Sequence, residues 1–301
     1  MPKDLKGIYP AVTTPFAADG SVAISRLREN IARYNKTRVA GYVLNGSTGE
    51  SVLLRWEEIE RVWEAARDSA APGKILIAGT AAESTAETIE HTNRAAAIGC
   101  DVALVRTPHY FKPQMTPAAL IEFYLRVADA AKIPVLVYSV PIFTQLKLQA
   151  DVVGRVAQHP NIIGMKDSSG DAKGVKEILA AVPKSFQMLV GAVSVLHEAL
   201  QMGAVGAILA VACAFPEMCV EAYEASRLGD AARATATQQK LVSAANLFGP
   251  KYGIAGLKYV MDCVGYYGGQ PRPPLLPVDE AAKAELDTML ASVVSEAVPG
   301  D

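Results

Sequence analysis

Short apolar runs alternate with longer segments of helical spacing from the start of the chain to about residue 225. The runs are four or five residues long, and none alternates polar and apolar residues with a period of two. Such runs predict strands buried on both faces, which is typical of a parallel sheet covered by helices. The eight predicted strands are residues 8–12, 41–44, 75–78, 101–105, 135–138, 162–165, 187–190 and 205–209.

The segments between these runs carry the start and stop signals of helices. Ser84 and Glu87 have the spacing of a capping box, and Thr116 followed by Pro117 is an N-cap with proline at the first helical position. Gly203 is suited to end the helix before it, because glycine accepts a left-handed backbone. Strands and helices are therefore expected to alternate.

This alternation predicts an α/β fold, a (β/α)8 TIM barrel formed by residues 1–225. A doubly wound open sheet is the alternative, but a glycine-rich phosphate turn usually follows its first strand, and residues 13–16 read Thr-Thr-Pro-Phe. Beyond residue 225 the strand signal stops, and residues 226–301 predict a C-terminal helical appendage. Its expected helices are 231–247, 254–264 and 281–298, with a loop rich in glycine and proline at 265–276.

Charge and composition favour a small-molecule enzyme over a binding protein for polymers or membranes. The net charge is −2 over 301 residues and basic residues are dispersed, so neither nucleic acid nor an acidic membrane surface is expected as a partner. The N-terminus lacks the apolar stretch of a signal peptide, and no uninterrupted apolar segment is long enough to cross a bilayer. We expect a cytoplasmic protein.

The cysteines and histidines show no metal-ligand spacing. Cys100, Cys213, Cys219 and Cys263 are scattered without a C-x-x-C pair, and we expect them to be small buried side chains in a reduced compartment. The four histidines lack the H-E-x-x-H pattern. No metal and no cofactor are predicted.

Polar residues with catalytic chemistry fall at the predicted strand ends, where the active sites of such barrels lie. Lys166 follows the sixth run, where its amine would be partly desolvated. Desolvation disfavours the ammonium form, so the amine could attack a carbonyl and form a Schiff base. Tyr138, one strand away, could carry the proton to and from the carbinolamine. Taken singly, these residues also fit a solvated lysine that closes a strand and a packed aromatic ring.

The loop after the second run could bind an anion. Ser47 and Thr48 supply hydroxyls and free backbone N–H groups that suit a carboxylate, whereas the loop lacks the G-K-[ST] of a phosphate-binding P-loop. A tight strand-to-helix turn capped by Ser47 or Thr48 is the equally simple alternative.

Several of these motifs together resemble the dihydrodipicolinate synthase / N-acetylneuraminate lyase superfamily of pyruvate-dependent class I aldolases. They are Gly-Ser-Thr-Gly-Glu at 46–50, Tyr138 three residues before Pro141, and Gly-Met-Lys-Asp at 164–167. Within the superfamily the chain is most similar to 4-hydroxy-2-oxoglutarate aldolase, through residues 159–171 and 252–269.

The resemblance implies a role for each matching residue. Lys166 would be the Schiff-base lysine, Tyr138 the proton donor and acceptor, and Ser47 a link in the proton relay. Tyr110 would complete that relay in the neighbouring subunit's site, which implies a tight dimer, usually paired into a homotetramer (a dimer of dimers). Ser47 and Thr48 would bind the pyruvyl carboxylate, Gly191 and Ile208 would line the pyruvate pocket, and Ser168 would contact the distal part of the substrate.

One departure from the synthases affects the choice of substrate. Phe143 stands where the resemblance predicts an arginine that holds the carboxylate of aspartate semialdehyde, and losing that fork-shaped cation removes much of the recognition. The positions of the feedback-lysine site also differ, with Trp56, Ile59 and Glu83 there.

The favoured prediction is a lyase that cleaves 4-hydroxy-2-oxoglutarate to pyruvate and glyoxylate, with no cofactor beyond the covalent Lys166 Schiff base. The alternatives are 4-hydroxy-tetrahydrodipicolinate (dihydrodipicolinate) synthase and a 2-keto-3-deoxy sugar acid aldolase or dehydratase. From a different class, the alternative is a non-catalytic 2-oxo-acid binding protein.

Overall fold

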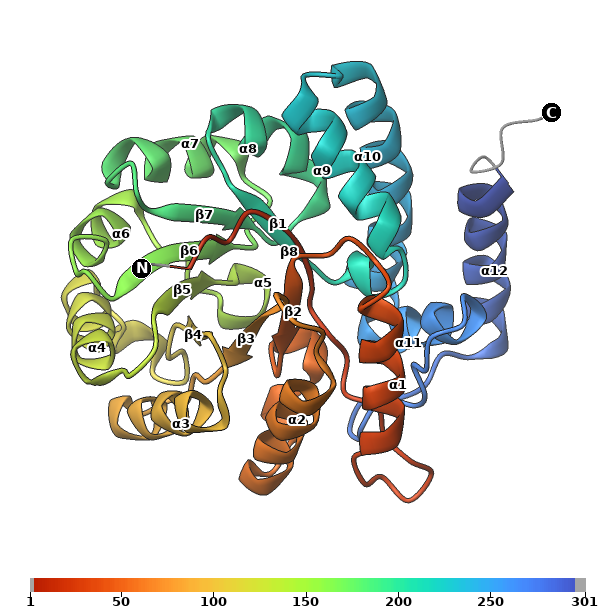
Figure 1. The fold of residues 1–301 in the computed structure, drawn as a ribbon, viewed down its shortest axis with the longest axis horizontal. Coiled ribbons are helices and arrows are strands. Elements are labelled where there is room, and N and C mark those ends of the chain that lie inside the picture. The colour runs from red at the N-terminus through yellow and green to blue at the C-terminus, as the bar shows by residue number, and fades with distance from the viewer. Residues whose placement is uncertain (1–2, 296–301) are drawn as a thin grey trace.

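The computed structural model describes residues 3–295 as a barrel of eight parallel strands surrounded by helices (Figure 1). Neighbouring strands follow the order β1-β8-β7-β6-β5-β4-β3-β2. The ring closes between its two ends, because Ala40 N–H donates to Ile8 O and Val12 N–H donates to Val43 O, both at 2.9 Å. The predicted (β/α)8 barrel is therefore confirmed. The strands are β1 Gly7–Pro10, β2 Gly41–Leu44, β3 Ile75–Gly79, β4 Val102–Arg106, β5 Val135–Ser139, β6 Ile162–Asp167, β7 Gln187–Val190 and β8 Gly206–Leu209.

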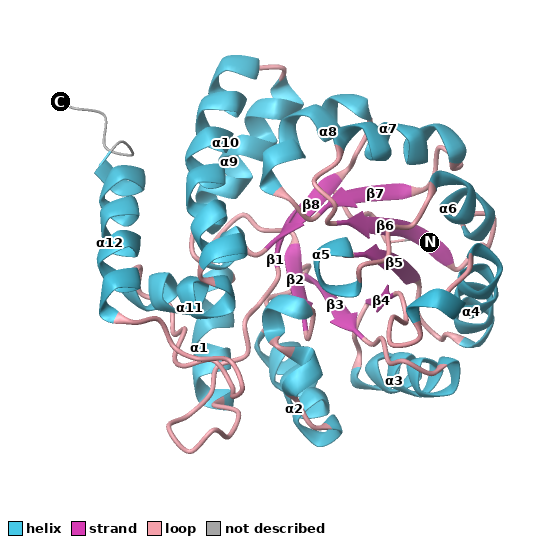
Figure 2. Ribbon diagram, turned by 180° about the vertical axis from the view of Figure 1, so that it is seen from behind, coloured by secondary structure: helices cyan, strands magenta, loops and turns pink. Residues whose placement is uncertain are grey.

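The helices form a layer around the strands (Figure 2). The predicted signals act as expected: the Ser84 side chain accepts from Glu87 N–H, Thr116 caps the helix that begins at Pro117, and Gly203 ends a helix in the left-handed region. The helices are α1 Ile24–Tyr34, α2 Trp56–Ser69, α3 Thr85–Ile98, α4 Pro117–Ala130, α5 Pro141–Thr144, α6 Ala150–Val156, α7 Ala172–Ala181, α8 Leu196–Met202, α9 Pro216–Leu228, α10 Ala231–Asn246, α11 Gly253–Cys263 and α12 Glu280–Ser295.

Two of the predicted strands differ from the structure by two residues at one end, whereas the other six differ by at most one residue at either end. The first runs over Gly7–Pro10 rather than 8–12, and its continuation is reduced to one bridge between Ala11 and Val43. The sixth continues past 165 to Asp167, so the pairing of β6 with both neighbouring strands includes Lys166. This pairing fixes the lysine backbone on both sides.

Alternation along the strands separates two packed regions. Val102, Leu104, Leu136 and Tyr138 belong to a buried cluster that fills the inside of the barrel. The residues between them, Ala103 of β4 and Val137 of β5, belong to the larger cluster shared with the helices. Every second residue of a strand therefore points toward the barrel axis, which is the geometry that brings strand-end side chains together.

Helices α10 and α11 lie along one side of the barrel, and α12 packs on these two helices farther out (Figure 1). Leu241 of α10, Leu257 of α11 and Leu286 of α12 are buried in the same cluster as the outer faces of the strands. The boundary predicted at residue 225 falls inside α9. The division of the chain into a catalytic barrel and a C-terminal helical region stays a prediction. The predicted last helix begins at 280, and its expected end at 296–298 lies outside the described residues.

One expectation about the cysteines is wrong. Cys100, Cys213 and Cys219 are buried, but Cys263 is exposed. It ends α11 just before the 265–276 loop, where the helix leaves the core. Sequence spacing could not show which face of the last helical turn lies toward solvent.

Candidate active site

A cavity of about 710 Å³ opens at the carboxyl ends of the strands, between the barrel and the helices α10 and α11. Predicted site residues from several different strands converge on it, as the barrel geometry requires. Those that line it are Lys166, Tyr138, Ser47, Thr48, Gly191, Ile208, Ser168 and Phe143. Tyr110 does not.

Lys166 and Tyr138 are neighbours across β5 and β6. Their Cα atoms are register partners, and each residue is only 5% exposed. The Lys166 Nζ lies 4.4 Å from the centroid of the Tyr138 ring. Among the described residues no carboxylate forms an ion pair with Lys166. The amine and the phenol are thus buried together at the base of the cavity.

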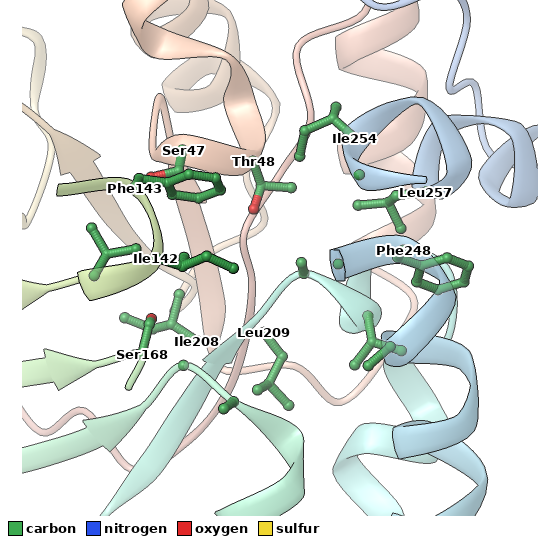
Figure 3. Close-up of a pocket in the computed structure, with 18 of the residues that line it drawn as sticks. Ser47, Thr48, Ile142, Phe143, Ser168, Ile208, Leu209, Phe248, Ile254 and Leu257 are labelled. Atoms are coloured by element: carbon green, nitrogen blue, oxygen red, sulfur yellow. The ribbon is translucent and has the colours of Figure 1, made fainter. Parts of the chain in front are cut away.

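Ser47 and Thr48 lie in a short turn, Ser47–Gly49, directly after β2. No side chain caps this turn, which contradicts the alternative in which Ser47 or Thr48 serves as a cap. The residues on either side, Asn45 and Glu50, have φ near +55°, a left-handed conformation that non-glycine residues rarely adopt. The strained backbone turns both hydroxyl-bearing residues toward the cavity, where they are available to a ligand (Figure 3).

Gly191 lies close against two other site residues. A Cβ added there would lie 1.9 Å from Ser168 Oγ and 3.0 Å from Lys166 Cε. Its N–H donates to Asp167 O at 2.6 Å, which ties the end of β7 to the end of β6. Glycine is required at this position by space and not by its φ angle.

The outer half of the cavity is mostly apolar. Phe143 and Ile142 of α5 are exposed at its mouth, and Phe248, Ile254 and Leu257 reach it from the C-terminal helices (Figure 3). No sequence pattern linked these helices to the site, because their periodicity only indicated helices. Ser168 lies beside the strand end, where the resemblance expects contact with the distal part of the substrate.

Tyr110 lies on the surface and is 78% exposed. Glu83 holds this turn, because one carboxylate oxygen accepts from the backbone N–H groups of His109 and Tyr110 at 2.8 and 2.9 Å. Burial opposes ionisation of Glu83, but these hydrogen bonds and Arg106 outweigh it, so its pKa lies below the ordinary glutamate value. The side chain of Tyr110 is thus presented outward, and its action in a second subunit stays a prediction.

Sequence reasoning missed the group that supports the Ser47–Gly49 turn. Glu50 forms a fully buried ion pair with Lys258 of α11, with Nζ and Oε1 2.6 Å apart. Lys258 also donates to Thr14 O and Gln270 O, and Arg272 N–H donates to the other Glu50 oxygen at 2.8 Å. The C-terminal region therefore braces the loop that carries Ser47 and Thr48.

Arg106 also lines the cavity and was not predicted, and so does His109, which the sequence places among the polar residues after the fourth strand. The sequence signal for Arg106 was a charged residue directly after a buried apolar run. Alternation along β4 places residue 106 on the same face as residues 102 and 104, which is the inner face of the barrel.

The described residues hold no group of three or more His, Cys, Asp or Glu side chains arranged to bind a metal ion. Within residues 3–295, no helix combines the length and the apolar character that crossing a membrane requires.

Comparison with known proteins identifies the family. Residues 4–293 match the family described as the dihydrodipicolinate synthetase family. The chain belongs to this family. It is similar to 4-hydroxy-tetrahydrodipicolinate synthase of Exiguobacterium sp., at 32% identity over 93% of this chain and 95% of the relative. The enzyme of the same name from Methanothrix thermoacetophila is 33% identical over 96% and 97%.

A solved structure of this family resembles the fold closely. YagE from E. coli K12, a prophage protein of the dihydrodipicolinic acid synthase family in complex with pyruvate, has a TM-score of 0.90. Its sequence is 30% identical, and the match covers 96% of this chain and 98% of YagE. The superfamily predicted from the motifs is confirmed, whereas the finer similarity to 4-hydroxy-2-oxoglutarate aldolase stays a prediction.

Proposed function

We propose that this family member is a pyruvate-dependent class I aldolase that forms a Schiff base through Lys166. The observation that carries the proposal is the buried pair of Lys166 and Tyr138, with the amine 4.4 Å from the ring centroid at the base of a large cavity. The pyruvate complex of YagE adds support, because pyruvate is the ligand of a structural relative.

In the proposed reaction, the neutral Lys166 amine attacks the C2 ketone of a 4-hydroxy-2-oxo acid. Tyr138 is the group beside the amine that can protonate the carbinolamine oxygen, so that water leaves and the iminium forms. The C3–C4 electrons then flow into the iminium as the C4 hydroxyl loses its proton and the aldehyde departs. Protonation of the enamine at C3 and hydrolysis of the imine release pyruvate and restore the lysine.

The carboxylate next to C2 would bind at Ser47 and Thr48. Both hydroxyls line the cavity, and neither has a hydrogen-bond partner within the described residues. The first N–H groups of a helical turn also lack partners inside the turn and suit an anion. Gly191 and Ile208 would bound the same end of the substrate, and no metal or other cofactor enters the scheme.

For the substrate, we propose 4-hydroxy-2-oxoglutarate, cleaved to pyruvate and glyoxylate. Phe143 supports this choice over the synthase reaction, because it offers no cation to aspartate semialdehyde. The second candidate is 4-hydroxy-tetrahydrodipicolinate synthase, which the names of the two relatives favour. A 2-keto-3-deoxy sugar acid would be a poorer fit to the apolar outer half of the cavity.

The test is a pair of specificity constants measured on one preparation, with Lys166→Ala as the blank. One assay follows cleavage of 4-hydroxy-2-oxoglutarate, and the other follows condensation of pyruvate with aspartate semialdehyde. We expect kcat/KM for cleavage to be at least about tenfold higher than kcat/KM for condensation. Phe143→Arg should lower this ratio, because the added arginine can bind the carboxylate of aspartate semialdehyde. A higher kcat/KM for condensation would assign the chain to the synthase reaction instead.

A further inference from the structure

Arg106 is the last residue of β4 and lies in one row with the two proposed catalytic residues. Its Cα is the register partner of Tyr138, and the Cα of Tyr138 is the partner of Lys166. Val102 and Leu104 of the same strand face the inside of the barrel, so alternation places the Arg106 side chain on the inside too. Arg106 also lines the cavity.

The guanidinium is held by one of its three nitrogens. Nη1 donates to Glu83 Oε1 at 3.2 Å and to Thr107 O at 3.1 Å, and it contacts His109 Nδ1. Nε and Nη2 have no hydrogen-bond partner among the described residues, although the side chain is only 14% exposed. These two nitrogens form one edge of the guanidinium, whose N–H groups match the two oxygens of a carboxylate.

Arg106 is also the permanent cation best able to receive an acidic ligand. Besides Lys166, which the proposed reaction needs as a neutral amine, it is the sole lysine or arginine among the described residues that line the cavity. Burial and then the nearby Arg106 charge lower the pKa of His109, so this histidine adds no competing cation at neutral pH. Glu50, the carboxylate that lines the cavity, is paired with Lys258.

We propose that the Nε–Nη2 edge of Arg106 binds the distal carboxylate of a dicarboxylic 2-oxo acid whose C2 reacts at Lys166. This inference rests on the proposed function and names the specificity-determining cation of that same site. Two strand spacings, about 10 Å, separate the backbones of Arg106 and Lys166, and both side chains line the same cavity of about 710 Å³. The cation thus comes from β4, whereas α5 presents Phe143.

The test compares two five-carbon ligands that differ only at the far end, 2-oxoglutarate and 2-oxopentanoate, in borohydride trapping of the intact protein. The half-saturating concentration for adduct formation is measured by mass spectrometry for each ligand and for pyruvate. We expect 2-oxoglutarate to half-saturate the wild-type protein at a concentration at least about tenfold lower than 2-oxopentanoate does. A charge-assisted hydrogen bond between Arg106 and the distal carboxylate is strong enough to give a difference of this size.

Arg106→Gln should remove this difference while pyruvate capture stays within about threefold, because pyruvate has no distal carboxylate. Arg106→Lys should retain part of the preference, since it keeps the charge and loses the fork. Equal half-saturation by both ligands in the wild-type protein, or an unchanged preference in Arg106→Gln, would overturn the assignment. Failure of pyruvate itself to form an adduct would instead refute the proposed function, so the two failures are distinguishable.

Discussion

At the residue scale, the site depends on close contact at Gly191. A methyl group at this position would overlap Ser168 Oγ and press on the Cε atom of Lys166. The backbone there cannot retreat freely, because Gly191 N–H is bonded to Asp167 O at 2.6 Å. The side chains must therefore move, and one of them carries the reactive amine.

We predict that Gly191→Ala lowers kcat/KM by about 100-fold or more, since misplacing a reactive group by about 1 Å has costs of this size. Gly249→Ala is the matched control, because Gly249 lines the same cavity and a Cβ there meets nothing within 4 Å. Adding Ser168→Ala to Gly191→Ala removes the nearest clash and should restore part of the adduct formation. Equal losses in the two alanine variants would contradict the steric account.

Asp167, next to the lysine, gives a pH-dependent prediction. Burial raises the pKa of its carboxyl above the ordinary value of 3.8, although hydrogen bonds from Ser169 oppose the shift. A raised folded-state pKa means that its contribution to stability is fully present below the unfolded-state value and is lost as pH rises through the folded-state value.

Asp167→Asn keeps an oxygen that accepts from Ser169 and removes the buried charge. We therefore expect the variant to gain stability relative to wild type as pH rises above about 4 and to reach a constant difference near neutral pH. Thermal melts at a series of pH values would measure the difference. A difference that is independent of pH would show that the carboxyl ionises as easily in the folded protein as in the unfolded chain.

At the element scale, α11 and the following loop hold the turn that bears Ser47 and Thr48. The buried pair of Glu50 and Lys258 joins α11 to this turn, and the Arg272 N–H joins the loop to it by donating to Glu50. The Arg272 guanidinium joins the same loop to α2 by two bonds to Glu58. Removing one member of a buried pair leaves the other charge without compensation.

We predict that Lys258→Met destabilises the protein by about 3–5 kcal/mol and weakens pyruvate capture, because Glu50 would be left buried and unpaired. Lys173→Met is the control, since its pair with Glu177 is exposed on both sides and such pairs contribute little. Urea titrations followed by fluorescence and by pyruvate adduct formation test both effects. An unfolding midpoint equal to that of Lys173→Met would show that the Glu50–Lys258 pair does not stabilise the protein.

The strands were predictable because both of their faces are apolar, and the caps were predictable because their chemistry is local. Lys166 and Tyr138 followed from these strands, since consecutive strand ends meet at one face of a barrel. The support from Lys258 was not predictable, because no periodicity relates a position on α11 to a turn after β2. Arg106 could have been predicted, because alternation along β4 places it on the same face as residues 102 and 104. The predicted strand ended at residue 105, so Arg106 was not considered.

At the scale of the whole molecule, exposed aromatic side chains lie outside the cavity on the same face as its mouth residues. Tyr110 and Phe111 are 78% and 66% exposed and pack edge to face with ring centroids 5.1 Å apart. Glu83 fixes the turn below them. We propose that this turn enters a neighbouring subunit's site in a tight dimer, two of which pair as a homotetramer.

Mixing two inactive variants tests this proposal. We expect Lys166→Ala and Tyr110→Ala each to be impaired, and their co-refolded mixture to regain activity in about a quarter of the sites, because one site of each mixed dimer carries neither change. Sedimentation velocity on the wild-type protein would report the assembly. A mixture no more active than the average of its components would show that Tyr110 does not act across a subunit boundary.

A covalent imine between pyruvate and Lys166 is the step on which the whole proposed reaction depends. Borohydride reduction in the presence of pyruvate, followed by peptide mass spectrometry, detects this imine and locates it in the chain. We expect one reduced pyruvyl group per chain, located at Lys166, and none in Lys166→Ala. An adduct at a different lysine, or a wild-type protein that stays unmodified at saturating pyruvate, would contradict the proposed reaction.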